Sequence, residues 1–153
     1  MKLSLLYGTE TGNTEMLCED LQEHLEGDHE VSIANLEDTD PADLSSDMFY
    51  IFVCSTYGEG ELPQSAIPFA EALKSGGADL TGIRFAVFGF GDTTYEATYN
   101  NGSVVLMQAL LKAGAEFIGE RGLHDASGLE DPIDIAAPWS VAQIALARAQ
   151  QPD

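Results

Sequence analysis

Short apolar segments alternate with helical patterns along almost the whole chain, and this alternation restricts the fold more than any other feature. Residues 48–54 are continuously apolar, and residues 83–90 are apolar apart from Arg84, which is typical of strands covered on both faces. A strand–helix–strand order favours parallel strands, because each helix returns the chain to the edge where the next strand starts. We therefore predict one α/β domain over residues 1–153, with a parallel sheet and helices on both faces.

The bounds of the expected elements follow from apolar periodicity and from the glycines that end several helical patterns. Strands are expected at residues 2–7, 30–35, 48–54, 83–90 and 116–120. Helices are expected at residues 13–26, 65–75, 103–113 and 133–149, with one helical turn at residues 40–44.

Acidic residues outnumber basic ones by 26 to 6, which gives the chain a net charge of −20. Between Lys2 and Lys74 there is no Lys or Arg. Such a surface would repel nucleic acid and anionic lipid, and it would attract a partner with a basic face. An acidic surface that serves solubility alone is the alternative explanation. We expect no nucleic-acid or membrane partner, and a monomer.

The sequence also bears on the compartment. Cys18 and Cys54 have no spacing typical of a metal or redox site, so we expect two reduced thiols packed in the core. The sequence begins without a basic-then-apolar leader and has no apolar run of membrane-spanning length. We therefore expect a cytoplasmic protein.

The first predicted strand runs through a segment rich in glycine and threonine into a helix, Gly8-Thr9-Glu10-Thr11-Gly12-Asn13-Thr14. This arrangement binds a phosphate, because free backbone N–H groups and the positive end of the helix dipole meet at the helix start. A Walker loop would have Lys after its second glycine, whereas Asn13 follows Gly12. Backbone N–H groups and threonine hydroxyls would therefore hold the phosphate without a cation. A simple helix N-cap by Thr11 or Asn13 is the alternative.

Two further unusual loops follow the third and fourth predicted strands, and each contains glycines and a tyrosine. These tyrosines are Tyr57, in the loop over residues 55–63, and Tyr95, in the loop over residues 89–101. Loops that follow parallel strands meet at the carboxyl edge of the sheet, where ligands bind. A phosphate cradle beside two aromatic side chains suits a planar ring with a phosphate tail. An ordinary glycine-rich turn is the alternative for residues 55–63.

Three motifs in these loops resemble the cofactor loops of the flavodoxin family. They are Thr9-x-Thr11-Gly12-x-Thr14, Ser55-Thr56-Tyr57-Gly58-Glu59-Gly60 and Phe88-Gly89-x-Gly91-Asp92-x-Thr94-Tyr95-Glu96. The resemblance is to short-chain, MioC-like flavodoxins and to the FMN domain of diflavin reductases. It implies a flavodoxin-like three-layer sandwich, a five-stranded parallel sheet in the order 2-1-3-4-5, and FMN as the cofactor.

The same resemblance implies which residues bind FMN. Residues 9–14 would bind the phosphate, Tyr57 and Tyr95 would flank the isoalloxazine ring, and Asp125 matches an acidic position near the flavin. The full implied set is Thr9, Glu10, Thr11, Gly12, Asn13, Thr14, Ser55, Thr56, Tyr57, Gly58, Glu59, Gly60, Phe90, Gly91, Asp92, Thr94, Tyr95, Tyr99, Asn100 and Asp125. No catalytic residue and no metal ligand is implied.

The implied function is that of a low-potential electron carrier, not an enzyme. It would shuttle single electrons between a basic-faced NAD(P)H-dependent flavodoxin reductase and acceptor proteins. An FMN-dependent NAD(P)H quinone or flavin reductase, or the stand-alone FMN subunit of a diflavin reductase, is the alternative. A phosphoacceptor receiver domain is excluded, because it needs a carboxylate where this chain has Cys54-Ser55.

Three further residues could serve either function or structure: Cys54, His124 and Trp139. We expect Cys54 to pack in the core, because no histidine is placed in sequence to activate it. We expect His124 in a solvent-facing loop, with tuning of the flavin charge as the alternative. Trp139, in the last predicted helix, is expected to serve packing.

Overall fold

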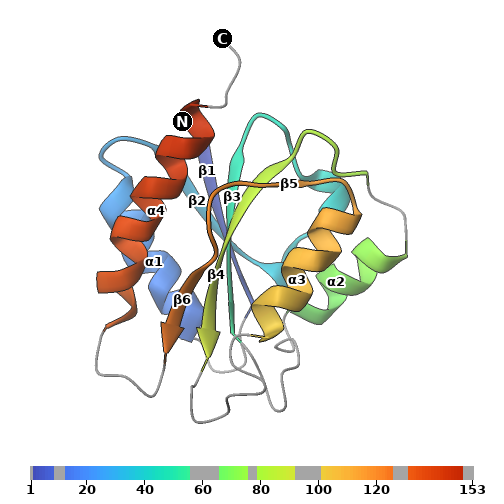
Figure 1. The fold of residues 1–153 in the computed structure, drawn as a ribbon, viewed down its shortest axis with the longest axis horizontal. Helices are drawn as coiled ribbons and strands as arrows, with labels where there is room; N and C mark the ends of the chain where they lie inside the picture. The colour runs from blue at the N-terminus through green and yellow to red at the C-terminus, as the bar shows by residue number, and fades with distance from the viewer. Residues whose placement is uncertain are drawn as a thin grey trace.

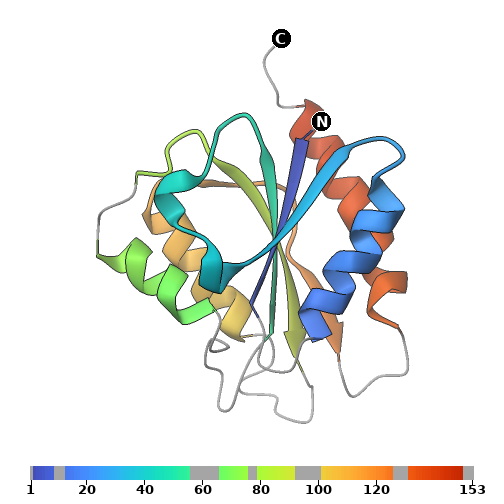
Figure 2. The ribbon, with the colours of Figure 1, turned by 180° about the vertical axis from the view of Figure 1, so that it is seen from behind.

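The apolar segments form a parallel sheet that lies between two layers of helices, as Figure 1 shows from one side and Figure 2 from behind. In this computed structural model, the structure describes residues 2–8, 13–55, 66–75, 79–91, 101–125 and 131–149. Helices α1 and α4 cover one face of the sheet, and α2 and α3 cover the other (Figure 1). None of the helices in these ranges is long and apolar enough to cross a membrane.

The expected elements are present with small changes at their ends. The strands are β1 (Lys2–Gly8), β2 (Glu30–Asn35), β3 (Phe49–Ser55), β4 (Arg84–Gly91), β5 (Glu116–Phe117) and β6 (Gly122–Asp125). The helices are α1 (Asn13–Leu25), α2 (Ile67–Lys74), α3 (Asn101–Lys112) and α4 (Pro132–Ala149), with short 3₁₀ turns η1 (Leu36–Asp38) and η2 (Pro41–Asp43). The strand order is β2-β1-β3-β4-β5, and every pairing is parallel, so the predicted order is confirmed.

The fifth position of the sheet differs from the single strand expected at residues 116–120. Two short strands occupy it, since β5 and β6 both pair with β4. Gly119 has φ +73°, a left-handed conformation that takes the chain out of the sheet between them. The Glu120 N–H then donates to Gln143 Oε1 at 3.0 Å, and the Glu120 carbonyl accepts from Trp139 Nε1 at 2.8 Å. Side chains of α4 therefore satisfy the backbone where the strand is broken.

Side chains of the central strands alternate between the two faces of the sheet. In β3, Phe49, Ile51 and Val53 belong to the cluster under α1 and α4, whereas Phe52 and Cys54 belong to the cluster under α2 and α3. All five are 0% exposed. Burying each large side chain contributes about 1.5–3 kcal/mol to folding. The carboxyl ends of these strands are therefore fixed by a packed core on both faces.

Candidate functional site

Strands β1, β3 and β4 end side by side at one edge of the sheet. Gly8 pairs with Cys54, and Cys54 pairs in turn with Gly89. The chain leaves β1 for α1 on one face, and it leaves β3 for α2 on the opposite face (Figure 1). This divergence is the topological switch point, where open α/β sheets bind their ligands.

Thr14 ties the start of α1 to the end of β1. Its side chain is 0% exposed, and its Oγ1 donates to the Gly8 carbonyl at 3.1 Å. This bond joins the two ends of the segment at residues 9–12 and so fixes where the first turn of α1 begins. The leading N–H groups of a helix have no partner within it, and here they lie at the switch point. The first turn of α1 is therefore held in place at the point where an anion could bind.

Glu15, in the first turn of α1, interacts with Tyr7 near the end of β1. Burial raises the pKa of the Tyr7 hydroxyl above its usual range, and the charge of Glu15 and a hydrogen bond with it raise the pKa further. The phenol therefore stays protonated at neutral pH and acts here as a neutral group.

The structure brings together those predicted cofactor residues that it describes. Thr14 is described in full, and the backbone is described for Asn13, Ser55, Phe90, Gly91 and Asp125. All six lie at the carboxyl edge, where Ser55 pairs with Phe90, and Gly91 pairs with Asp125. The remaining predicted residues lie outside the described part of the chain: Thr9, Glu10, Thr11, Gly12, Thr56, Tyr57, Gly58, Glu59, Gly60, Asp92, Thr94, Tyr95, Tyr99 and Asn100.

His124 does not lie in a solvent-facing loop, so that expectation is wrong. It is part of β6, next to Asp125, and its side chain is 6% exposed. The reason is that residues 122–125 pair with β4, which draws them into the sheet. His124 is therefore a buried residue of the sheet, close to its carboxyl edge.

Cys54 and Trp139 serve packing, as expected. Cys54 is 0% exposed, and burial raises the pKa of its thiol to about 12, so it is no nucleophile at neutral pH. The Trp139 ring lies 5.3 Å from the Phe88 ring, measured between centroids. Burial also raises the pKa of the Cys18 thiol, and the nearby charges of Glu15 and Glu19 raise it further, by less than burial does.

The role of α4 in placing β6 was not found from the sequence. Gly122 lies against Phe88 and Trp139, where an added Cβ would come within 2.5 Å of Phe88 Cδ2 and 2.8 Å of Trp139 Cε2. Together with the contacts of Gln143 to Glu120, this close approach positions the strand that ends at Asp125. Gly119 and Gly122, three residues apart, were the available signal for a break in the strand.

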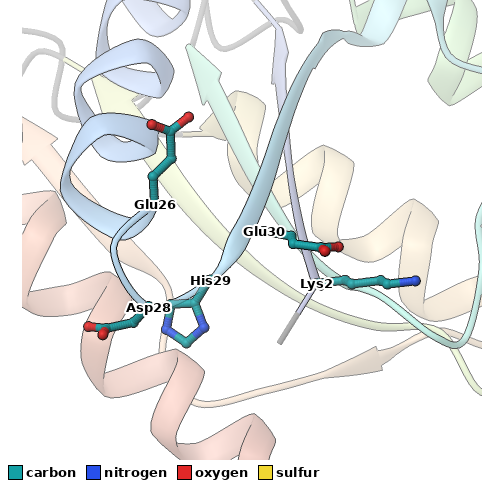
Figure 3. Close-up of a pocket in the computed structure, with 5 residues that line it drawn as sticks. All are labelled: Lys2, Glu26, Asp28, His29 and Glu30. Atoms are coloured by element: carbon teal, nitrogen blue, oxygen red, sulfur yellow. The ribbon is translucent and has the colours of Figure 1, made fainter.

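A hollow of about 460 Å³ lies at the opposite, amino edge of the sheet, lined by Lys2, Glu26, Asp28, His29 and Glu30 (Figure 3). Burial lowers the pKa of His29, and the nearby charge of Arg148 contributes to the same shift. Within the described ranges no group of three or more His, Cys, Asp or Glu residues could hold a metal ion. This hollow is separate from the switch point and has no part in the candidate site.

Comparison with known proteins agrees with this geometry. A family model described as Flavodoxin matches residues 5–139. The flavodoxin of Maridesulfovibrio salexigens is 39% identical over 137 residues, which cover 86% of this chain and 91% of that protein. NADPH–cytochrome P450 reductase of Rattus norvegicus is 38% identical over 131 residues, which cover 81% of this chain but 19% of the reductase. This chain thus spans about a fifth of that reductase's length.

Among solved structures, oxidised flavodoxin 2 from Bacillus cereus superposes with a TM-score of 0.81 at 30% sequence identity, covering 95% of this chain and 99% of that chain. The family match covers the end of β1, the other five strands of the described sheet and the start of α4. The chain therefore belongs to the flavodoxin family.

Proposed function

We propose that this chain is a carrier of single electrons that moves between a basic-faced NAD(P)H-dependent reductase and acceptor proteins, and that it is not itself an enzyme. As a flavodoxin it binds FMN and serves electron transfer. The observation that carries the proposal is the switch point, where β1, β3 and β4 end together beside the fixed start of α1.

The described residues fit the phosphate end of FMN. The first turn of α1 presents backbone N–H groups, and Thr14 holds that turn in place through Gly8. Residues 9–12 would complete the cradle, and Tyr57 and Tyr95 would flank the ring. Bound FMN supplies one-electron redox chemistry, and the protein tunes it through hydrogen bonds, stacking and charge.

Acidic residues near the cofactor would lower its reduction potential. The flavin loops contain Glu59, Glu61, Asp92 and Glu96 and have no Lys or Arg. A carboxylate about 10 Å from the charge of the reduced cofactor costs roughly 1.7 kcal/mol at an effective dielectric of about 20, which is about 70 mV for one electron. Several such carboxylates would make the protein a low-potential donor.

The distribution of basic residues supports a basic partner. Lys2 and Arg84 begin β1 and β4, and the last turns of α2, α3 and α4 hold Lys74, Lys112 and Arg148. Because helices run antiparallel to the strands, all five lie toward the amino edge, away from the candidate site (Figure 1). A basic partner would therefore approach the carboxyl edge with little repulsion.

The test is reconstitution followed by redox titration. The purified protein should bind FMN with a yellow flavin spectrum, and it should take up electrons in two separated one-electron steps. A single two-electron step would contradict the carrier proposal. Failure to bind FMN at all would contradict the cofactor assignment.

An NAD(P)H quinone or flavin reductase is the less favoured candidate, because the match to NADPH–cytochrome P450 reductase covers only 19% of that protein and the flavin loops have no Lys or Arg to hold a 2′-phosphate. Steady-state oxidation of NADPH without added reductase would support that candidate; a carrier should show none. A cytoplasmic location is part of the carrier proposal, and two buried cysteine thiols without a disulfide agree with a reducing compartment.

A further inference from the structure

Glu15 has a carboxylate at a position of α1 from which it can compete with a bound anion. It is the third residue of the helix and lies in its first turn. A Glu at this position can turn back and accept a hydrogen bond from a free backbone N–H group at the helix start. A phosphate at the same helix end would use these N–H groups. Glu15 must therefore be kept from capping its own helix if the phosphate of FMN is to bind there.

The hydroxyl of Tyr7 holds the Glu15 carboxylate elsewhere. Tyr7 lies next to Gly8 near the end of β1, its side chain is 8% exposed, and it packs in the core cluster under α1. Its hydroxyl hydrogen-bonds with the Glu15 side chain. The charge of Glu15 also acts on the buried thiol of Cys18, which lies one turn further along α1. The carboxylate is therefore directed toward β1 and the second turn of α1, away from the first N–H groups of the helix.

A chain of hydrogen bonds fixes the direction of the Tyr7 hydroxyl. Tyr7 is the register partner of Asn35 on β2, and the two side chains hydrogen-bond. Burial raises the pKa of the phenol most, the bond with Glu15 raises it further, and the bond with Asn35 lowers it. These directions show that the hydroxyl donates to Glu15 and accepts from Asn35. The Glu37 N–H donates to Asn35 Oδ1 at 3.0 Å, which leaves the amide N–H group of Asn35 to donate to Tyr7.

We propose that Tyr7 is a positioning residue for cofactor binding: its hydroxyl keeps the Glu15 carboxylate off the start of α1, so that the N–H groups there stay open to the phosphate of FMN. Tyr7 acts through Glu15 and not on the phosphate. A carboxylate at the helix start would occupy these N–H groups and would also repel the phosphate. This role rests on the proposed placement of the phosphate at the start of α1, and it is independent of the redox partner.

FMN and riboflavin are the probes that test this role, because riboflavin has the same ring and lacks the phosphate. Tyr7→Phe removes the hydroxyl and releases Glu15 toward the helix start. We expect the dissociation constant of FMN to rise about fivefold, the size of a charge effect at a helix end, and that of riboflavin to stay unchanged. Fluorescence titration of each flavin into the flavin-free full chain, in a buffer without phosphate, measures the constants.

A second substitution tests whether the released carboxylate causes the loss. In Tyr7→Phe/Glu15→Gln the released side chain carries no charge, so the FMN affinity should return to within about twofold of wild type. Glu15→Gln alone should change the FMN affinity by less than Tyr7→Phe does, because Tyr7 already holds this side chain away from the helix start.

Tyr50→Phe is the matched control. Tyr50 is 3% exposed, and its hydroxyl accepts a hydrogen bond from the Ser45 N–H at 2.7 Å, but it lies in the core cluster under α2 and α3. This variant also removes the hydroxyl of a buried tyrosine. It should lower the melting temperature, as Tyr7→Phe does, and leave the ratio of the FMN and riboflavin affinities unchanged. Circular dichroism checks that each variant is folded.

The results that overturn the proposal can be told apart. If the wild-type chain binds FMN no more tightly than riboflavin, the phosphate is not held at the start of α1, and the role of Tyr7 falls with that placement. If the wild type prefers FMN and Tyr7→Phe keeps the same preference, the placement stands and the role of Tyr7 is wrong. If Glu15→Gln does not restore FMN affinity to Tyr7→Phe, or if Tyr50→Phe loses the preference too, general loosening of the fold explains the loss.

Discussion

Thr14 is the residue whose position most affects the candidate site. Its hydroxyl joins the first turn of α1 to the Gly8 carbonyl, and the side chain is fully buried. Thr14→Val keeps the shape but removes the donor, so the free energy of unfolding should fall by about 1 kcal/mol. We also expect weaker FMN binding, because the start of α1 is no longer held. Denaturant unfolding of the apoprotein and FMN titration measure the two effects.

Thr39 offers a matched control, because its Oγ1 donates to the Asn35 carbonyl at 2.9 Å, outside the candidate site. Thr39→Val should lower stability by a similar amount and leave FMN affinity unchanged. Thr14→Ser should restore both properties. If Thr14→Val and Thr39→Val weaken FMN binding equally, the hydroxyl of Thr14 has no special role at the site.

The two thiols give a second prediction at this scale. Burial raises the pKa of Cys54 to about 12 and raises that of Cys18 as well. The reactive thiolate is therefore scarce in the folded state at pH 8, and access is blocked too. A thiol-specific chromogenic reagent should find no rapidly reacting thiol in the native protein and two after unfolding in denaturant. Rapid native reaction would contradict the buried packing of both residues.

At the scale of elements, the core strands could be predicted because nearly all of their consecutive residues are apolar. Residues 48–54 are apolar throughout and residues 83–90 are apolar apart from Arg84, and β3 and β4 form within one residue of those bounds. The break between β5 and β6 could not be predicted in the same way. It depends on Trp139 and Gln143, which reach Glu120 from 19 and 23 residues further along the chain. His124 was misplaced for the same reason.

The candidate site likewise has features that could be predicted from the sequence and features that could not. The carboxyl-edge position of Thr14, Ser55 and Gly91 followed from strand order, which is a property of the fold, whereas that of Asp125, on the unpredicted β6, was implied by the resemblance alone. The hydrogen bond from the Thr14 hydroxyl to the Gly8 carbonyl depends on side-chain direction, which spacing does not determine. The roles of Tyr57 and Tyr95 rest on resemblance alone and stay predictions.

Gly122 gives a prediction at the scale of elements. Gly122→Ala would bring a Cβ within 2.5 Å of Phe88 Cδ2, so β6 or α4 must shift, and overpacking of this kind costs about 1–3 kcal/mol. We expect lower stability and, because β6 ends at Asp125, weaker FMN binding. Gly27→Ala is the control, since nothing lies within 4 Å of its added Cβ. Equal thermal stability of the two variants would contradict this account of β6.

For the whole molecule, the arrangement of charge matters more than its total. The chain has a net charge of −20, yet five of its six basic residues lie toward the amino edge: Lys2, Lys74, Arg84, Lys112 and Arg148. Docking of a basic reductase at the carboxyl edge is an attraction, which salt weakens.

We therefore expect the rate of electron transfer from a basic reductase to fall as NaCl rises. Stopped-flow reduction in a series of buffers of increasing ionic strength measures the trend. Glu15→Lys on α1 should slow reduction more than Lys74→Glu speeds it, because Glu15 lies in the first turn of α1, whereas Lys74 ends α2 at the far edge. A reduction rate that does not change with salt would show that docking is governed by contacts other than charge.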